Sequence, residues 1–329
     1  MTRRSLRQNT STCFAVLATA AFAGALLLAP SARAQEAELK VPDGLPDWAF
    51  NVPDPKVQPF KVKIEGTIRA PGSTREYDAS KIGGNARPPD WFPDEHPPAP
   101  KVVTGGEGIR FACGSCHLMS GQSHSEAADI AGQPAEYLIR QIGYYKSGAR
   151  KDDARMGPIA KATSDEDVRA AAEYFSAIKP IVFVKVIETA DPPKTFIATA
   201  GRHRYLDPAG GTEPIGHRIL EVPADPFRTE IRDPHSGFIA YVPPGSIAKG
   251  EELVKNGKCA SCHGATLQGM GEVPRLAGLQ PLFIARQLFD LQYGSSAGAA
   301  AAPMKPVVAN LKEDDIIAIA SYLGSLPPT

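Results

Sequence analysis

Two short stretches of this chain, FACGSCHLMSGQ (111–122) and KCASCHGATLQG (258–269), contain the same pattern, Cys-x-x-Cys-His. A Cys-x-x-Cys pair alone is typical of a zinc knuckle or a dithiol redox site. The histidine directly after the second cysteine points instead to covalent attachment of haem. A motif of this kind requires each copy to fold around a large planar group, so it constrains the fold more than any other feature.

The cysteine count favours haem over the alternatives. The chain has five cysteines; Cys13 lies near the N-terminus, and the others all lie in the two motifs: Cys113, Cys116, Cys259 and Cys262. Disulfides, or zinc bound by both pairs together, would leave the repeated histidine unexplained. In the haem interpretation the thiols form thioethers, and His117 and His263 are proximal ligands of the iron. We therefore expect two covalently bound haem c groups.

The first 34 residues have the pattern of a signal peptide. Three arginines precede a 17-residue apolar stretch, Cys13–Ala29, and an Ala-x-Ala site follows at Ala32–Ala34. The alternative is an uncleaved membrane anchor, for which the stretch is short. We expect cleavage between Ala34 and Gln35 and a periplasmic mature protein.

The net charge argues against a nucleic-acid partner. The chain has 36 basic and 36 acidic residues, and the N-terminal segment holds four arginines and no acidic residue. The mature chain therefore has 32 basic and 36 acidic residues, a formal charge of −4. Four haem propionates would make it more acidic, which does not suit a nucleic acid.

The two motifs belong to a sequence repeat. At an offset of 146 residues, Ala131-Gly132 aligns with Ala277-Gly278, and Arg140-Gln141 aligns with Arg286-Gln287. After a two-residue insertion the offset is 148, and further pairs align: Met156 with Met304, Asp167 with Asp315, Tyr174 with Tyr322, and Pro180 with Pro328. The chain thus contains a duplicated domain, and we call residues 101–180 the first repeat and 246–329 the second.

Each repeat predicts the same helices after its motif. PAEYLIRQIGYYKSG and PLFIARQLFDLQYG each open near a proline and close at a glycine, Gly148 or Gly294. A last helix follows. In the first repeat Ser164 is the expected N-cap with Asp167 completing a capping box, and Val168 to Ile178 supply an apolar face. In the second repeat Asn310 and Glu313 have the same spacing.

Met156 and Met304 are the candidate distal ligands. They lie 39 and 41 residues after His117 and His263, in expected loops before the last helix. A thioether reaching the iron from the face opposite the histidine is how His/Met ligation is built. Met119 and Met270 have no partner in the repeat, and we expect both to be packing residues. The other histidines are expected to be solvated or hydrogen-bonded: His96, His124, His203, His217 and His235. Of these, His124 is the rival ligand.

The order of C-x-x-C-H, Ala-Gly, Arg-Gln, Gly, Met and a capped helix resembles class I cytochromes c. More narrowly it is similar to the tandem, two-haem c-four type, over 101–180 and 246–329. The resemblance implies small all-α haem domains that shuttle electrons between periplasmic or membrane redox enzymes. In the family a proline carbonyl accepts a hydrogen bond from the proximal histidine. Pro274 fits, but the first repeat has Ala128.

There are two further departures from the family, one in the first helix of the first repeat and one in the methionine segment of the second. The family's first helix is clear in SIAKGEELVKNGK, whereas its counterpart VVTGGEGIRFA is rich in glycine and predicts a short or distorted helix. The methionine segments differ in charge, because the first is ARKDDARM and the second is SSAGAAAAPM. We expect the two haem faces to differ electrostatically.

Two segments lie outside the resemblance. Residues 35–100 are rich in proline, which disfavours a core, and predict an extended arm pinned to a haem domain by aromatic residues: Trp48, Phe50, Trp91 and Phe92. Residues 181–245 contain four expected short strands: IVFVKVI, KTFIATA, RILEVPA and GFIAYVP. We expect a small β-rich insertion that fixes the two haem domains. The fold class is mainly α, with this arm and insertion.

Two functions remain open from the residues. The first is an electron carrier, or a cytochrome subunit of an oxidoreductase. It would take single electrons from a dehydrogenase and pass them to an oxidase or other acceptor, with membrane association only through such a partner. The second is a two-haem enzyme of the peroxidase kind, with one open or releasable iron site. An enzyme that binds its active iron through a distal cysteine is excluded, because all four cysteines of the mature chain are used to attach haem. Two filled axial positions favour the carrier.

Overall fold

The computed structural model describes residues 44–52, 62–82, 84–123, 127–198 and 203–329, and all belong to one structural unit, Leu39–Thr329. The expected signal peptide, with Cys13, lies outside the described residues. Within these ranges, no helix combines the length and the apolar character that a membrane crossing requires.

The first repeat is helical. Its helices are α1 (Lys101–Thr104), α2 (Gly114–His117), α3 (Ala135–Ser147), α4 (Met156–Ala162) and α5 (Asp165–Ser176). As predicted, α3 ends at Gly148 in the left-handed conformation, and Ser164 caps α5 by accepting a hydrogen bond from the amide of Asp167 at 3.1 Å. The glycine-rich segment yields only the four residues of α1, which confirms that this helix is short.

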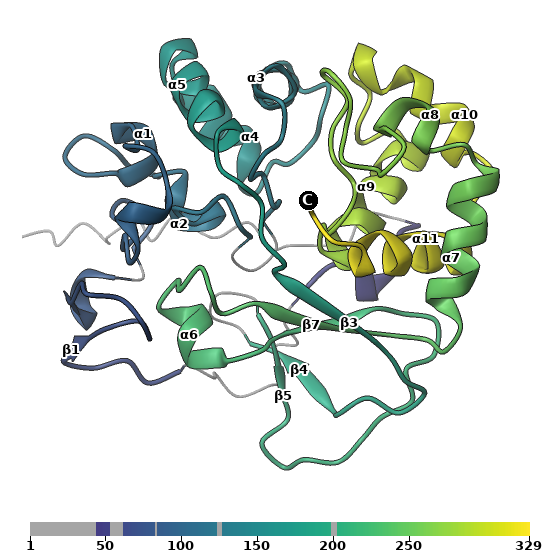
Figure 1. Cartoon of the computed structure of the whole chain (residues 1–329), viewed down its shortest axis with the longest axis horizontal. Helices are drawn as coiled ribbons and strands as arrows, with labels where there is room; N and C mark the ends of the chain where they lie inside the picture. Colours follow the sequence, from purple (N-terminus) through teal and green to yellow (C-terminus); the bar gives the residue numbers. More distant parts are fainter. Residues whose placement is uncertain (1–43, 53–61, 83, 124–126, 199–202) are drawn as a thin grey trace, which may run out of the picture. The chain divides into compact units, whose positions relative to one another are not determined.

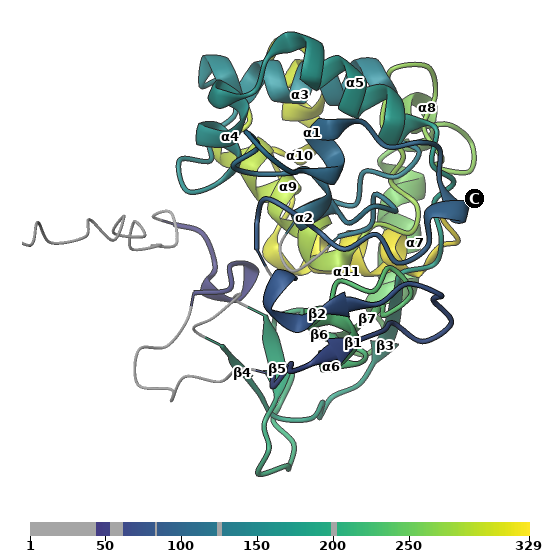
Figure 2. The ribbon, with the colours of Figure 1, turned by 90° about the vertical axis from the view of Figure 1, so that its left-hand side faces the viewer.

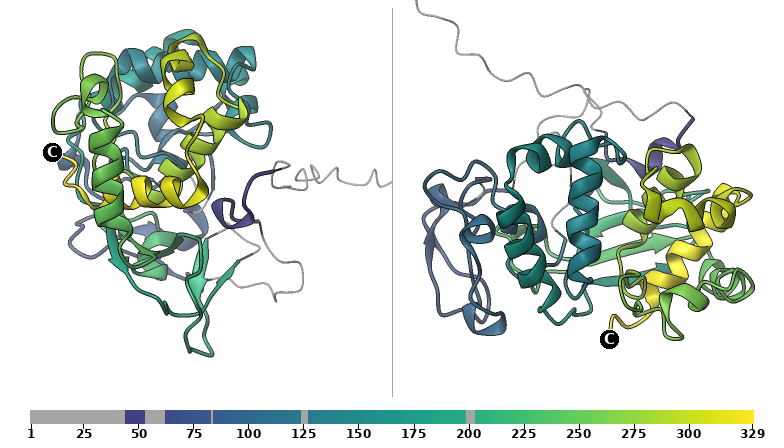
Figure 3. Two further views of the ribbon diagram at one scale, coloured as in Figure 1. Left: turned by 90° about the vertical axis from the view of Figure 1, so that its right-hand side faces the viewer. Right: turned by 90° about the horizontal axis from the view of Figure 1, so that it is seen from above.

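The second repeat has the same order of helices. They are α7 (Ser246–Asn256), α8 (Ala260–His263), α9 (Pro281–Tyr293), the 3-10 helix η4 (Ala299–Met304), α10 (Lys305–Val308) and α11 (Glu313–Ser325). Seen from above, the helices of the first repeat and those of the second form two groups (Figure 3). The left-handed Gly294 closes α9 as predicted. The repeat in the sequence is therefore a repeat in the fold.

Helices α7 and α11 cross at a glycine. A Cβ atom on Gly250 would lie 2.0 Å from the carbonyl oxygen of Ala318 and 2.7 Å from the Cβ of Tyr322. Only a residue without a side chain allows the two backbones this close. The contact closes the second repeat around its core.

We expect Gly250→Ala to lower the free energy of unfolding by about 1–3 kcal/mol, because the added methyl must push α7 and α11 apart. Chemical denaturation measures the change. Gly143→Ala is the matched control, since Gly143 lies inside α3 with nothing within 4 Å of its would-be Cβ. That change should raise stability by about 0.5–1 kcal/mol, as alanine is the better helix former. Equal effects of the two variants would contradict the close crossing.

The start of α11 differs from the prediction. Asn310 is not its N-cap; the helix begins at Glu313, and its N-cap is Lys312. The carboxylate of Asp315 accepts a hydrogen bond from the amide of Lys312 at 3.1 Å. The acidic residue of the capping box is therefore Asp315 rather than Glu313, two residues later than expected. The N-cap residue is a lysine instead of the usual serine or threonine.

The insertion contributes a three-stranded sheet. Its central strand β7 (Phe238–Val242) pairs in parallel with β3 (Val184–Glu188) and antiparallel with β6 (Leu220–Pro223). A two-stranded sheet of β4 (Thr195–Ile197) and β5 (Arg204–Leu206) and the short helix α6 (Pro226–Glu230) complete it. The four predicted strands are present, and β5 and α6 are additional.

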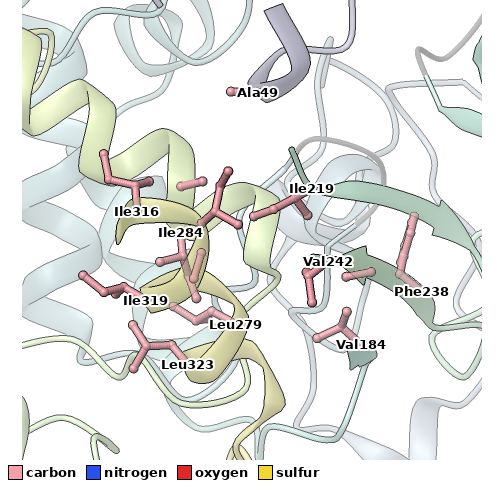
Figure 4. Close-up of a cluster of buried hydrophobic side chains, with 14 of the residues drawn as sticks. Ala49, Val184, Ile219, Phe238, Val242, Leu279, Ile284, Ile316, Ile319 and Leu323 are labelled. Atoms are coloured by element: carbon pink, nitrogen blue, oxygen red, sulfur yellow. The ribbon is translucent and has the colours of Figure 1, made fainter. Parts of the chain in front are cut away.

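The sheet packs against the second repeat, below its helices in Figure 1. Val184 and Val242 of the strands lie on the side of the sheet that faces Ile284 and Leu323 of the helices, and Phe238 lies farther along the sheet (Figure 4). These side chains belong to one buried cluster that extends over both segments. Burial of apolar surface, worth about 25 cal/mol per Å², is the main contribution that stabilises such a contact between a sheet and helices.

The arm reaches the second repeat through Trp48, which lies in the 3-10 helix η1 (Asp47–Ala49). The Trp48 ring packs edge-on against Phe289 with a centroid distance of 6.0 Å, and its indole nitrogen donates to Glu313 at 2.5 Å. Ala49 beside it is fully buried in the joint cluster. This part of the arm behaves as a pin on a haem domain.

The described remainder of the arm, 62–82 and 84–100, is more structured than its composition predicts. It forms a hairpin of β1 (Thr67–Ile68) and β2 (Tyr77–Asp78), followed by 3-10 helices η2 (Ala79–Lys81) and η3 (Pro93–Glu95). Trp91 is 2% exposed, packs in a small core with Ile68 and Ile231, and donates its indole N–H to the Ile231 carbonyl at 2.8 Å. Figure 2 shows the hairpin in the region of α6. We expected Trp91 to pin the arm to a haem domain. This expectation is wrong, because Trp91 packs against Ile231 of the insertion instead.

Candidate functional site

Each Cys-x-x-Cys-His motif forms one turn of helix. The amide of His117 donates to the carbonyl of Cys113, and that of His263 to the carbonyl of Cys259, both at 3.0 Å. Residues three and four apart on a helix share a face, so each turn presents both thiols and the imidazole on the same side. All four thiols are free, so neither pair forms a disulfide.

The imidazoles are oriented by backbone carbonyls. The Nδ1 of His117 lies 2.7 Å from the carbonyl oxygen of Ala128, and that of His263 lies 2.8 Å from the oxygen of Pro274. A carbonyl oxygen only accepts, so Nδ1 carries the hydrogen, and the lone pair on Nε2 remains for a metal. The first repeat thus keeps the bond without the family's proline.

The protonation states suit the same role. Burial lowers the pKa of His117 and that of His263, against a smaller opposing effect of the hydrogen bond to each carbonyl. Both imidazoles are therefore neutral at pH 7, as a metal ligand must be. Burial raises the pKa of Cys113 to about 12 and also raises those of Cys116 and Cys259. Such thiols lack the low pKa of a dithiol redox site, and this donor set fits haem.

The two candidate distal ligands lie at helix ends rather than in loops. Met156 is the first residue of α4, and Met304 is the last residue of η4. The Asp152 carboxylate accepts a hydrogen bond from the Arg155 amide at 2.9 Å, which turns the chain into α4. Both methionines are half-buried. The predicted loop position is wrong, and the ligand role of both residues remains a proposal.

The two other methionines behave differently from each other. Met119 is buried in the core of the first repeat, as predicted. Met270 is 56% exposed, so its predicted packing role is wrong. Gly269 and Gly271 on either side both have positive φ, and this turn carries Met270 out into solvent.

The described histidines outside the motifs have hydrogen-bonding partners, as expected. The pairs are His96 with Asp90, His203 with Tyr205 and Glu230, His217 with Asp314, and His235 with Glu95. His124, the rival ligand, lies outside the described residues. His203, the residue before β5 of the insertion, differs from the other three in being buried, at 2% exposed.

The two motif turns differ in what covers them. In the first, the Ser115 hydroxyl donates to the Asn85 carbonyl at 2.7 Å, and the Arg232 guanidinium donates to the Ser115 carbonyl at 2.9 Å. In the second, the Ser261 hydroxyl bonds locally to the Lys258 carbonyl, and Cys262 is exposed. Among the described residues, the arm and the insertion thus bond to the first turn, whereas the Ser261 hydroxyl of the second turn bonds to a residue close by in the sequence. Spacings of 30 and 117 residues gave no sequence signal for these contacts.

A buried ion pair joins the repeats beside the two histidine loops. Arg275 donates to Asp129 at 3.2 Å, and each side chain is at most 2% exposed. Gln133 accepts from the Arg275 amide at 2.9 Å and donates to its carbonyl at 3.2 Å. Sequence reasoning missed this pair, although its signal was present: the two residues lie 146 apart, at equivalent positions of the repeat.

Comparisons with known proteins find relatives of this chain. The cytochrome c family model matches residues 247–327. A cytochrome c-554(547) of Halothiobacillus neapolitanus is 36% identical over 90 residues, which are 25% of this chain and 98% of that protein. Cytochrome c4 of Stutzerimonas stutzeri is 25% identical over 232 residues, 67% of this chain and 87% of that protein.

A third relative is a thiosulfate dehydrogenase electron acceptor of Thiomonas intermedia, 26% identical over 227 residues, 66% of this chain and 79% of that protein. The longer matches, over 227 and 232 residues, exceed the length of either repeat, while the 90-residue match is about as long as one of them. Together with two attachment turns of the same geometry, these findings assign the chain. It belongs to the cytochrome c family, as a tandem class I cytochrome of the c4 type.

Proposed function

We propose that this chain is an exported, periplasmic cytochrome that carries single electrons on two covalently bound haems. Cys113 and Cys116 would hold the first haem, and Cys259 and Cys262 the second. The observation that carries the proposal is the repeated imidazole geometry, in which a carbonyl fixes Nδ1 and directs Nε2 to a metal. The bound haem supplies an iron that exchanges one electron at a time.

The distal ligands in this proposal are Met156 and Met304. Support comes from their equivalent places in the repeat and from the short helices α4 and η4, in which both methionines are half-buried. With a histidine and a methionine each binding the iron, no position would remain for a substrate. The protein then acts as a carrier rather than as an enzyme.

The partners are proposed from the chemistry and the relatives. A carrier needs an electron donor and an acceptor, and one relative is named a thiosulfate dehydrogenase electron acceptor. We therefore take a periplasmic dehydrogenase as the donor and an oxidase or other respiratory protein as the acceptor. Membrane association would come only through such a partner.

Carbon monoxide tests whether both irons are closed. In the purified, reduced protein we expect no change in the visible spectrum on addition of carbon monoxide, because the gas needs a free axial position. The Met304→Ala variant is the positive control, and should bind it. Binding to one haem of the unaltered protein would replace the carrier by the alternative, a peroxidase-like enzyme with an open site.

A further inference from the structure

A tyrosine of the first repeat contacts the segment of the second repeat that leads to Met304. The amide of Ala300, in η4, donates to the hydroxyl oxygen of Tyr144, in α3, at 2.9 Å. The ring of Tyr144 also lies against Gly298, the residue before η4, where a Cβ atom would be only 2.3 Å from the ring. One side chain therefore holds the start of the short helix that ends at Met304.

Backbone hydrogen bonds join the same segment to its counterpart in the first repeat. The amide of Lys151 donates to the carbonyl of Ser295 at 2.9 Å, and the amide of Ala297 donates to the carbonyl of Ala149 at 2.8 Å. The stretches that lead to the two methionines thus run side by side across the repeats.

The two methionine segments differ in how they are anchored. Asp152 and Ala300 each lie four residues before their methionine. The Asp152 carboxylate accepts a hydrogen bond from the amide of Arg155 at 2.9 Å, so the first segment carries its own anchor. An alanine side chain cannot accept a hydrogen bond. At this position of the second repeat, the anchoring oxygen comes from Tyr144 instead.

Such an anchor affects how firmly a ligand on the segment binds. The apparent affinity of a ligand falls with the fraction of molecules in which its segment has the binding conformation. A hydrogen bond made only in that conformation raises the fraction, by about twofold to tenfold for a bond of ordinary strength.

We propose that Tyr144 is a positioning residue for the distal ligand of the second haem, since it holds the segment that brings Met304 to the iron. This inference rests on the proposed ligation of each iron by a histidine and a methionine. It gives a residue of one repeat a role at the haem of the other. The second haem then holds its methionine more firmly when the two repeats are packed together.

Imidazole measures the effect in the ferric holoprotein, because it competes with methionine for the iron. In the Met156→Ala variant, the weak far-red band of methionine-bound ferric haem comes from the second haem alone. Adding Tyr144→Phe removes the hydroxyl and keeps the ring. We expect the apparent affinity for imidazole, followed by loss of this band, to rise about twofold to tenfold. In the Met304→Ala variant, whose band reports the first haem, Tyr144→Phe should leave the affinity unchanged.

Gly298→Ala tests the contact from the other side. Gly298 has a φ of −59°, which any residue adopts, so only the Tyr144 ring opposes an added methyl. The ring must move away, and the affinity for imidazole should rise at least as much as with Tyr144→Phe. Once Tyr144→Ala has removed the ring, Gly298→Ala should have no further effect, because the two changes act on one contact.

Tyr293→Phe is the matched control. Tyr293 ends α9 of the second repeat, and its hydroxyl donates to the carbonyl of Gly44 in the arm at 2.8 Å. This variant also loses one tyrosine hydrogen bond, but away from η4. Its affinity for imidazole should equal that of its parent.

The outcomes separate the ligand from its positioning. A Met156→Ala variant without a far-red band would overturn Met304 as the ligand, and the role of Tyr144 with it. With the band present, an affinity that Tyr144→Phe leaves unchanged, or an equal rise at both haems, would overturn only the role of Tyr144. Because Tyr144→Phe retains the ring, it decides the question even where Gly298→Ala does not fold.

Discussion

Replacing Cys259 and Cys262 by alanine is expected to leave a protein with one covalently bound haem instead of two. The thioether bonds are the only covalent links that the second motif can make, and all four thiols outside the N-terminal segment lie in the two motifs. The remaining haem stays on Cys113 and Cys116. Intact mass and haem absorbance after acid extraction both measure the change, as a loss of half the covalent haem.

Ser261→Ala is the control for this experiment. It alters an exposed residue inside the same motif while both thiols remain, so two haems should be retained. Haem that extracts freely from the unaltered protein would exclude covalent attachment. A double-cysteine variant that still carries two covalent haems would show that the second motif is not an attachment site.

Replacing Met156 or Met304 by alanine should remove the sixth ligand of one haem. The thioether favours ferrous iron, so its loss lowers the potential of that haem alone and produces high-spin iron. The weak far-red band of methionine-bound ferric haem should fall by about half in either single variant and vanish in the double variant. Visible spectra and redox titration provide the two readouts.

Met270→Ala is the matched control for the methionine experiment, since Met270 belongs to the second repeat but is exposed. Its spectrum and midpoints should equal those of the unaltered protein. If Met304→Ala also leaves both unchanged, the second haem takes a different ligand. That result would turn the proposed function toward an enzyme.

Features that depend on residues close together in the sequence are predicted well. The glycine ends of α3 and α9 and the serine cap of α5 depend on residues within one helical turn. The repeat then carries each prediction from one half of the chain to the other. The hydrogen bonds of both proximal histidines also follow from position, since any residue at 128 offers a carbonyl.

The features that the sequence does not predict depend on distant partners. Trp91 has a core because Ile231, 140 residues later, completes it. Met270 is exposed because two adjacent glycines turn the chain outward, which its hydrophobic character does not reveal. The ion pair between Asp129 and Arg275 joins the two repeats, so it can be predicted only once the way the repeats pack together is known.

The covered first motif places a constraint on how the protein is assembled. A haem can be joined to Cys113 and Cys116 only while both thiols are reachable. In the finished fold Asn85 and Arg232 hold the turn between these cysteines under the arm and the insertion. Arg232 follows the motif by more than a hundred residues, so under the proposed export it would emerge well after the two cysteines. The first turn therefore reaches its final surroundings only when residues far along the chain have joined it, whereas the Ser261 hydroxyl of the second turn finds its partner three residues away.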